Sequence, residues 1–200
     1  MPRITEERRE AQRKRVLDAA LACFDRSGFH RTTMQDIVRE SGLSPGAIYG
    51  YFESKEAVVE AVAAERHRAE NDLLVQALSA PDPIEGMTTF VHRYFEWLGR
   101  PEEKRRRRVG VQIWAESLHD GRMRASVDAG LAPLAAITRA LRVARRRKQL
   151  PPSIRPPALA RMLLALIQGF ILQQAWDPDV DIEAYRDTVL AALSALLDAG

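Results

Sequence analysis

Cysteine is almost absent from this chain of 200 residues, because Cys23 is the only one. A disulfide framework within one chain and a cluster of thiolates around a metal ion are therefore excluded. Histidine is also scarce, and none of the four histidines pairs with another at a metal-binding spacing. The sequence has neither a glycine-rich phosphate loop nor a recognisable set of nucleophile, base and orienting residue. We therefore expect no enzyme, no cofactor and no metal site.

Long hydrophobic runs are lacking as well. The first residues are polar, which predicts no apolar signal segment. The most apolar stretch, residues 159–175, is interrupted by one arginine and three glutamines and is short for a membrane span. We expect a buried helix there, in a cytoplasmic protein that does not bind a membrane. The formal net charge of +3 is compatible with nucleic acid but does not establish it.

The residues that are present follow helical periodicity almost throughout, and strand-like alternation is absent. This pattern predicts an all-α fold of about nine helices, with Pro133 kinking the seventh. The expected helices span residues 5–26, 33–40, 44–51, 54–78, 84–99, 102–118, 123–148, 157–175 and 182–198.

A helix-turn-helix pattern occupies residues 33–52. Thr33 is followed three positions later by Asp36, a spacing typical of a capping box at the start of a helix. Gly42 stands in a three-residue turn and can adopt the positive φ that such a turn requires. Two short helices joined in this way place the second in the major groove, with its N-terminal side chains at the base edges.

A longer string of residues is more specific than this geometry. It consists of Phe29, Thr32-Thr33-Met34, Asp36-Ile37, Gly42, Ser44, Ile48-Tyr49, Tyr51-Phe52, Ser54-Lys55-Glu56 and Ala61-Val62. Together these residues resemble the TetR/AcrR family of bacterial regulators, although Val38 and Ser41 stand where the family more often has alanine. The resemblance implies a helix-turn-helix DNA-binding domain over residues 1–55. It also implies a helical effector-binding and dimerisation domain over residues 56–200.

The resemblance further implies which side chains contact DNA. Thr33 can bind a phosphate through its hydroxyl and N–H groups, since a helix N-terminus favours anions. The hydroxyls of Tyr49 and Tyr51 can reach phosphates beside the groove, with core packing as the alternative role, and Lys55 can pair with the DNA backbone. The surface facing the bases is expected to consist of the small residues Ser44, Pro45, Gly46, Ala47 and Gly50.

A basic run precedes the motif and comprises Arg3, Arg8, Arg9, Arg13, Lys14 and Arg15. Such a run is usually a solvated helix face, but beside a DNA-binding motif contact with the DNA backbone is an equal alternative. Arg3 could reach the minor groove from a flexible arm. The other basic runs, residues 105–108 and 145–148, are expected to be solvated helix ends.

Aromatic residues are concentrated between Met87 and Trp114. Such a stripe is usually plain core, but the resemblance implies a second domain hollowed into an effector pocket that is mostly apolar. The candidate ligand-binding residues are Phe90, Tyr94, Gln112, Trp114, Glu116 and Gln168. The expected effector is a small apolar or amphipathic molecule, and a cation would fit if Glu116 faced the cavity. For each polar candidate, a surface or satisfied core position is the alternative.

The helix expected at residues 157–175 is apolar almost all round, so one face needs a partner. Together with one side of the last helix, it could form a four-helix interface between two chains, which resembles how this family dimerises. The expected interface residues are Leu163, Leu166, Phe170, Leu193 and Leu197.

The leading hypothesis is a homodimeric repressor that binds an inverted-repeat operator in double-stranded DNA and is released by a ligand. An activator, or a regulator without an effector, would use the same DNA-binding module. The alternative from another class is a small-molecule-binding protein or an enzyme with a relic DNA module. The presence of Thr33, Tyr49 and Lys55 argues against a relic.

Overall fold

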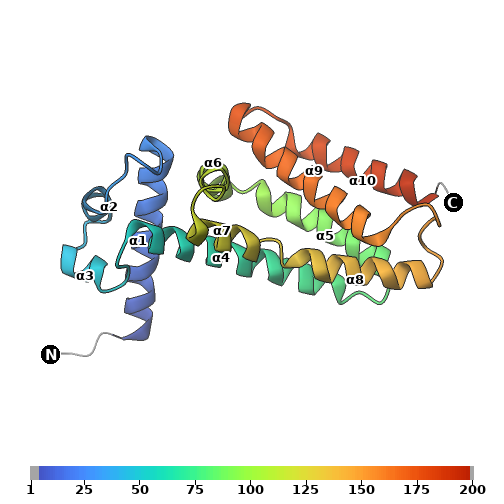
Figure 1. The fold of residues 1–200 in the computed structure, drawn as a ribbon, viewed down its shortest axis with the longest axis horizontal. Helices are drawn as coiled ribbons and strands as arrows, with labels where there is room; N and C mark the ends of the chain where they lie inside the picture. The colour runs from blue at the N-terminus through green and yellow to red at the C-terminus, as the bar shows by residue number, and fades with distance from the viewer. Residues whose placement is uncertain (1–4, 199–200) are drawn as a thin grey trace. The chain divides into compact units, whose positions relative to one another are not determined.

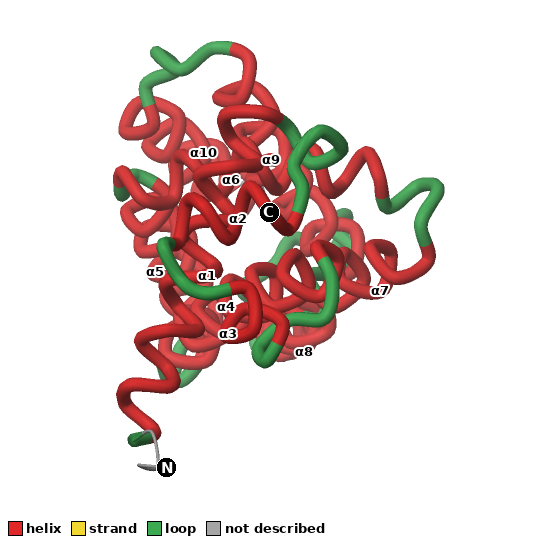
Figure 2. The backbone as a smooth tube through the Cα atoms, turned by 90° about the vertical axis from the view of Figure 1, so that its left-hand side faces the viewer, coloured by secondary structure: helices red, strands yellow, loops and turns green. Residues whose placement is uncertain are grey.

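A computed structural model describes residues 5–198, and every regular element in that range is an α-helix, as Figure 2 shows by colour. The all-α fold class is therefore confirmed. The helices are α1 (Glu6–Ser27), α2 (Met34–Ser41), α3 (Pro45–Tyr49), α4 (Lys55–Leu78), α5 (Pro83–Leu98), α6 (Pro101–Glu116), α7 (Gly121–Ala129), α8 (Pro133–Arg146), α9 (Pro156–Trp176) and α10 (Ile182–Asp198). The expected kink at Pro133 is a complete break between α7 and α8, because proline lacks the N–H group that a continuous helix needs.

The described residues form two compact units. The first consists of residues 5–66 and 105–127, and the second of residues 67–104 and 128–198. The helices α4, α6 and α7 each contribute residues to both units. The unit that contains the helix-turn-helix therefore also includes parts of the chain that follow it.

The first unit is organised around α1, which packs against α2 (Figure 1). Thr5 caps the start of α1 by accepting a hydrogen bond from the Arg8 N–H group at 3.4 Å, and Gly28 ends the helix with a φ of +80°. The apolar stripe predicted for this helix is buried, and it joins side chains from α2, α3, α4 and α6. The core includes Val16, Leu17, Ala20, Phe24, Ile37, Ile48, Phe52, Val58, Val109 and Ile113.

The second unit packs α5 against α8 and α10, and α8 against α9 (Figure 1). Three aromatic rings lie at its centre: the ring centroids of Phe95 and Phe170 are 5.3 Å apart, and those of Phe170 and Tyr185 are 5.0 Å apart. The Tyr185 hydroxyl donates a hydrogen bond to the Leu166 carbonyl oxygen at 2.9 Å. Burial of this ring raises the pKa of Tyr185 above its ordinary value. The ring cluster thus joins α5, α9 and α10.

Among the described residues, α9 is the one helix that is long and apolar enough to cross a membrane by length and composition. Core helices of soluble proteins meet the same criterion. On one side of α9, Leu159, Leu163, Ile167 and Phe170 are buried within the second unit. This side of α9 therefore forms core.

The residues of the predicted dimer interface on α9 and α10 differ in burial. Leu163, Phe170 and Leu193 are at most 4% exposed in a single chain. They belong to the core of their own unit, and their contact with a second chain stays a prediction. Leu166 and Leu197 are half-buried. Leu163, Phe170 and Leu193 face inward, which a helix that is apolar almost all round does not reveal from its sequence.

Candidate nucleic-acid interface and effector cavity

The entry to α2 is the predicted capping box. The Asp36 N–H group donates to Thr33 Oγ1 at 3.2 Å, and the Thr33 N–H group donates to Asp36 Oδ2 at 2.8 Å. The Thr33 hydroxyl also donates to Asp36 Oδ2, at 2.7 Å, and the Arg39 guanidinium pairs with the other carboxylate oxygen. These bonds, above all those from Thr33, lower the pKa of Asp36 to about 2. Both donors of Thr33 are therefore already bonded within the protein, and its contact with a phosphate stays a prediction.

The turn between α2 and α3 depends on Gly42. Its φ of +64° is strained for other residues, and a Cβ atom there would lie 2.8 Å from Arg15 Nη2. Ser41, at a position where the resemblance leads us to expect alanine, has a buried hydroxyl that donates to the Val38 carbonyl oxygen at 3.1 Å. The Ser41 hydroxyl oxygen in turn accepts from the Leu43 N–H group at 3.3 Å. The Ser41 hydroxyl therefore helps to close the turn.

The helix α3 presents the small surface that the sequence predicts. Ser44 caps α3 by accepting from the Ala47 N–H group at 3.3 Å, and Pro45 occupies the first turn. Ile48 is completely buried and anchors α3 to the core of the first unit. The outer side of α3 and its flanks is solvent-accessible, with Ala47 half-buried and the rest exposed: Ser44, Pro45, Gly46, Ala47, Tyr49 and Gly50.

The two tyrosines of this segment differ. Tyr49 is 53% exposed, so its hydroxyl can reach a phosphate. Tyr51 packs against the core of the first unit, and its hydroxyl donates to Gln12 Oε1 at 2.9 Å. A phenol has a single O–H donor, so Tyr51 cannot donate to a phosphate while this bond exists. The core role suggested as the alternative accounts for the position of Tyr51, and its contact with DNA stays a prediction.

Lys55, the first residue of α4, holds the loop that precedes α2. Its Nζ donates to the Phe29 carbonyl oxygen at 2.8 Å and lies 4.1 Å from the centroid of the Phe29 ring. The ammonium group has three donors, so two remain for another partner. The sequence predicts a phosphate contact for Lys55. The structure shows a second role, in which Lys55 acts as a clamp: its two contacts with Phe29 hold the loop at residues 28–33.

The same loop is held by two residues from α6. The Phe29 N–H group donates to Gln112 Oε1 at 3.0 Å, and His30 Nε2 lies 2.7 Å from Glu116 Oε1. Gln112 and Glu116 are four residues apart and therefore share one helix face. This placement corrects the expectation that they line the effector cavity. No local sequence signal could have revealed these bonds, because their partners are more than eighty residues away.

The basic run on α1 contains residues that form ion pairs within the protein and residues whose side chains are exposed. Arg13 pairs with Glu65 at 2.7 Å and lies over the Phe52 ring, so it is part of the fold of the first unit. Lys14 pairs with Asp18 at 2.8 Å on the surface. The residues Arg8, Arg9 and Arg15 are exposed. The proposed minor-groove contact of Arg3 lies outside the described residues.

A small apolar cavity lies within the second unit. Its volume is about 50 Å³, and Phe90 and Tyr94 line it as the sequence predicts. The remaining lining consists of Glu70, Met87, Val91, Gly130, Pro133, Ile137, Leu163, Leu164 and Ile167. Its polar groups are Glu70 and the Tyr94 hydroxyl, which donates to Glu70 Oε1 at 2.7 Å. Drug-sized ligands need roughly 300–1,000 Å³, so a ligand has to enlarge this cavity.

The other candidate ligand residues lie outside this cavity. Trp114 is half-buried in the first unit, between Gln112 and Glu116 in the sequence. Gln168 is half-buried on α9 and does not line the cavity. The carboxylate in the cavity is therefore Glu70 of α4, which the sequence did not single out because it stands in a charged stretch away from the aromatic residues.

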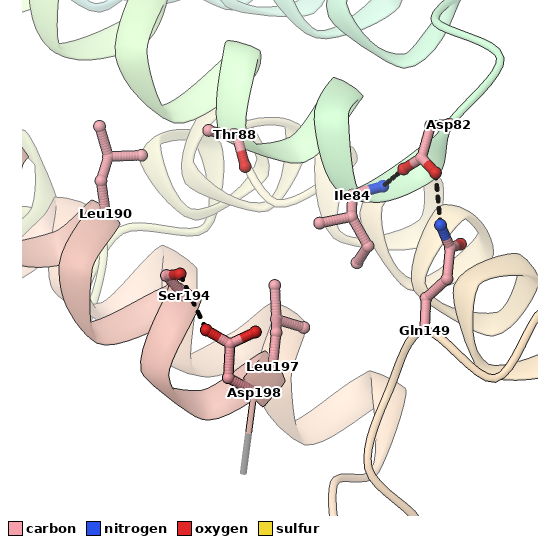
Figure 3. Close-up of a pocket in the computed structure, with 8 residues that line it drawn as sticks. All are labelled: Asp82, Ile84, Thr88, Gln149, Leu190, Ser194, Leu197 and Asp198. Atoms are coloured by element: carbon pink, nitrogen blue, oxygen red, sulfur yellow. Dashed lines mark hydrogen bonds between the residues drawn. The ribbon is translucent and has the colours of Figure 1, made fainter. Parts of the chain in front are cut away.

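A more open hollow of about 420 Å³ lies where α5 begins and α10 ends (Figure 3). Its two carboxylates, Asp82 and Asp198, already accept hydrogen bonds from the protein itself. Asp82 caps α5 by accepting from the Ile84 N–H group at 2.7 Å and also accepts from Gln149, while Ser194 donates to Asp198 at 3.4 Å. The Glu85 N–H group is the main cause of the lowered pKa of Asp82. Among the described residues, no group of three His, Cys, Asp or Glu side chains is arranged to hold a metal ion.

Comparison with known families gives two matches. Residues 16–62 match the tetR family of bacterial regulatory proteins. Residues 83–198, more than half of the chain, match the C-terminal domain of BetI-type transcriptional repressors.

Individual proteins and structures agree with these matches. The HTH-type transcriptional regulator TtgR of Pseudomonas putida is 30% identical over 207 residues, which cover 96% of each chain. Salmonella enterica GusR shares the fold, with a TM-score of 0.76 and 24% identity over 98% of this chain and 100% of that one. SmeT is the repressor of the Stenotrophomonas maltophilia multidrug efflux pump SmeDEF. Its complex with triclosan has a TM-score of 0.77 and 29% identity over 91% of each chain.

Proposed function

This chain belongs to the TetR family of bacterial regulatory proteins, and we propose that it is a repressor that a small molecule releases from its operator. The family consists of transcription regulators and not of enzymes. The chain binds DNA through its helix-turn-helix. The observation that carries the release mechanism is that one continuous helix, α4, bears both the loop clamp Lys55 and the cavity residue Glu70.

The operator is an inverted repeat that a homodimer reads. Two copies related by a two-fold axis present α3 to half-sites separated by about one helical turn of DNA or a multiple of it. The exposed side of α3 faces the bases, and Tyr49 contacts a neighbouring phosphate, with Thr33, Tyr51 and Lys55 as the other predicted contacts. In this proposal residues 1–55 bind DNA, and residues 56–200 bind the effector and form the dimer in the cytoplasm.

The effector is a mostly apolar molecule with one polar end. The cavity offers aromatic and aliphatic surface, and its polar corner is the Glu70 carboxylate with the Tyr94 hydroxyl. A ligand group that donates a hydrogen bond would be oriented there. The complex of the related SmeT with triclosan supports a small organic effector.

Release follows from movement of α4. A ligand that enlarges the cavity displaces the segment of α4 that carries Glu70, and the same helix carries Lys55 at its first position. Displacement of Lys55 loosens the loop before α2 and changes the spacing of the two recognition helices. The ligand shifts the equilibrium only as far as it favours this conformation over the DNA-bound one.

The test begins with selection of bound DNA from a random pool, which should yield an inverted repeat whose binding weakens steeply with salt. Tyr49→Phe should weaken binding to the selected site without changing the thermal stability of the protein. Compounds are then screened for release of this DNA, measured by fluorescence anisotropy. Tyr94→Phe should lower the affinity for an active compound and leave the operator affinity of the free protein unchanged.

Each half of the proposal can fail separately. A pool that yields no enriched sequence would refute the DNA-binding assignment of α3. Specific DNA binding that no compound alters would support a regulator without an effector, and increased transcription from the bound promoter would support an activator.

A further inference from the structure

The exposed side of α9 forms one continuous stripe. Its outward-facing residues recur every three or four positions, so they lie above one another on the helix. They are Ala158, Arg161, Met162, Ala165, Gly169, Leu172, Gln173 and Trp176, of which Gly169 and Leu172 are half-buried. Trp176, at the end of α9, is 74% exposed. A tryptophan left this exposed on a helix face that also presents Met162 and Leu172 indicates a surface that another chain covers.

The stripe is complementary to itself when two copies of α9 run antiparallel. Around a two-fold axis at the level of Ile167, Ala165 lies opposite Gly169 of the second copy, and these small residues let the two helices approach closely. In the same register Met162 lies opposite Leu172, and Ala158 lies opposite Trp176. Ala158 and Trp176 are separated by about five helical turns, so both face the same side of the helix.

A groove between α8 and α9 lies beside Ala158. Its volume is about 430 Å³, its apolar lining includes Leu134, Ala135 and Pro157, and its charged lining is Arg139, Arg142 and Arg161. All three arginines are exposed, and no carboxylate lines the groove. Within the described part of the chain, no ion pair joins them to a carboxylate. The groove therefore combines apolar side chains with positive charge that no ion pair neutralises within residues 5–198.

The segment that follows Trp176 has the opposite charge. Asp177 and Asp179 are exposed, and no ion pair involves either of them within the described residues. Asp181, the next acidic residue, caps α10 by accepting from the Glu183 N–H group at 2.9 Å. The end of α9 thus presents an aromatic ring followed by two carboxylates, and these carboxylates are opposite in charge to the arginines of the groove.

We propose that the groove binds Trp176 of a second copy of this chain, with Asp177 and Asp179 of that copy paired to the arginines. This contact deepens the homodimer of the proposed function and rests on it. The two-fold axis makes the contact occur twice, once at each end of the paired α9 helices. The arginine planes can stack on the indole ring, and an interface tryptophan that leaves water for a groove is a frequent source of binding energy.

The test is the dissociation constant of the dimer, measured by sedimentation equilibrium on the full chain. Trp176→Ala should raise it roughly 10- to 100-fold, as truncation of an interface hot spot does. Val75→Ala is the matched control, because Val75 is another exposed apolar residue of the same unit, 56% exposed and outside the stripe. It should leave the dissociation constant unchanged. Circular dichroism checks that each variant keeps its helical content.

Charge exchange tests the pairing. Arg161→Asp and Asp177→Arg should each weaken the dimer several-fold, and the double variant should recover most of the loss. Dilution of the wild type into monomers should also shift tryptophan emission to longer wavelength. Trp176→Phe should abolish that shift while keeping an aromatic ring in the groove.

The possible failures differ. If the wild type is a dimer, but Trp176→Ala and Arg161→Asp leave its dissociation constant within about twofold, this contact is refuted and the proposed homodimer stands. If Arg161→Asp weakens operator binding of an intact dimer, the groove meets DNA and the inference is overturned. A wild type that is monomeric at micromolar concentration refutes the homodimer and this contact together.

Discussion

Replacement of Lys55 by alanine can distinguish two roles of this residue, contact with DNA and support of the loop before α2. The sequence predicts that Lys55 contacts the DNA backbone, and the structure shows it bound to the carbonyl oxygen and the ring of Phe29. Alanine removes the ammonium group and both contacts. The loop at residues 28–33 then loses its hydrogen bond to α4, although it keeps the contacts from α6 and the burial of Phe29, so we expect α2 to be less firmly positioned.

The magnitude follows from the two contacts. A hydrogen bond from a charged donor contributes about 1.5–3 kcal/mol, and a cation–π contact at a partly exposed site contributes about 0.5–1 kcal/mol. Lys55 is half-buried, so solvent screens part of this sum and the lower half of the range applies. We expect Lys55→Ala to destabilise the first unit by about 2 kcal/mol, a large loss for a protein of ordinary stability. If the loop must be ordered for DNA binding, the operator affinity falls roughly 30-fold.

Two measurements distinguish a clamp from a phosphate contact. Thermal or urea unfolding gives the change in stability, and operator affinity measured at several salt concentrations gives the salt slope. Loss of one phosphate contact lowers this slope by about 0.9, whereas loss of a clamp lowers affinity at every salt concentration alike. Lys55→Met retains the apolar stem and serves as a second variant. Lys14→Ala is the control, because the surface pair of Lys14 with Asp18 contributes little.

We expect Lys55→Ala to lose stability and affinity and to lower the salt slope by about 0.9, because Lys55 both holds the loop and has two donors left for a phosphate. Lost stability with an unchanged slope would show that Lys55 holds the loop without contacting DNA. Unchanged stability together with a slope reduced by about one unit would show that Lys55 acts as a phosphate ligand, and the clamp would then be irrelevant to DNA binding.

Two further predictions concern the fold around the site. In Gly86→Ala the new Cβ atom would lie 2.7 Å from the Ala77 carbonyl oxygen, so α5 must move. Calorimetry should show that the free energy of unfolding falls by about 1–3 kcal/mol. Gly121→Ala, with open space at its Cβ position, is the control, and equal stability of the two variants would contradict this prediction. The pKa of Asp36 falls on folding from its ordinary value of 3.8 to about 2, so its stabilisation is present above pH 4 and is lost as the pH falls toward 2. Unfolding measured across that window should therefore depend less steeply on pH in Asp36→Asn, and identical profiles would show that the capping carboxylate contributes nothing.

Much of the DNA-binding module could be predicted because its signals are local. Thr33 and Asp36 are three residues apart, and Gly42 marks the turn by its own conformational freedom. The capping box and the turn therefore follow from short stretches of sequence. The bond from Tyr51 to Gln12 could not be predicted in this way, because its partners are 39 residues apart.

The second unit shows where sequence patterns fail. The helix α9 is apolar almost all round, so periodicity could not separate Phe170, which is buried, from Trp176, which is exposed. The aromatic residues that surround Gln112 and Glu116 in the sequence predict a place in the cavity for both. Their partners are backbone and side-chain atoms of Phe29 and His30, and only the tertiary fold brings these together.

The position of Gln112 and Glu116 changes what an effector has to accomplish. The loop before α2 is held from α4 by Lys55 and from α6 by these two residues, with donor–acceptor distances of 2.7 to 3.0 Å. Hydrogen bonds of this length are largely lost beyond about 3.5 Å, so a displacement of less than about 1 Å between the loop and either helix is sufficient to break them. On the proposed mechanism, an effector therefore needs no large rotation of the recognition helix. On this mechanism, a ligand that enlarges the cavity of about 50 Å³ acts by moving α4, which lines the cavity through Glu70. A movement of this size at Lys55 is enough to free the loop.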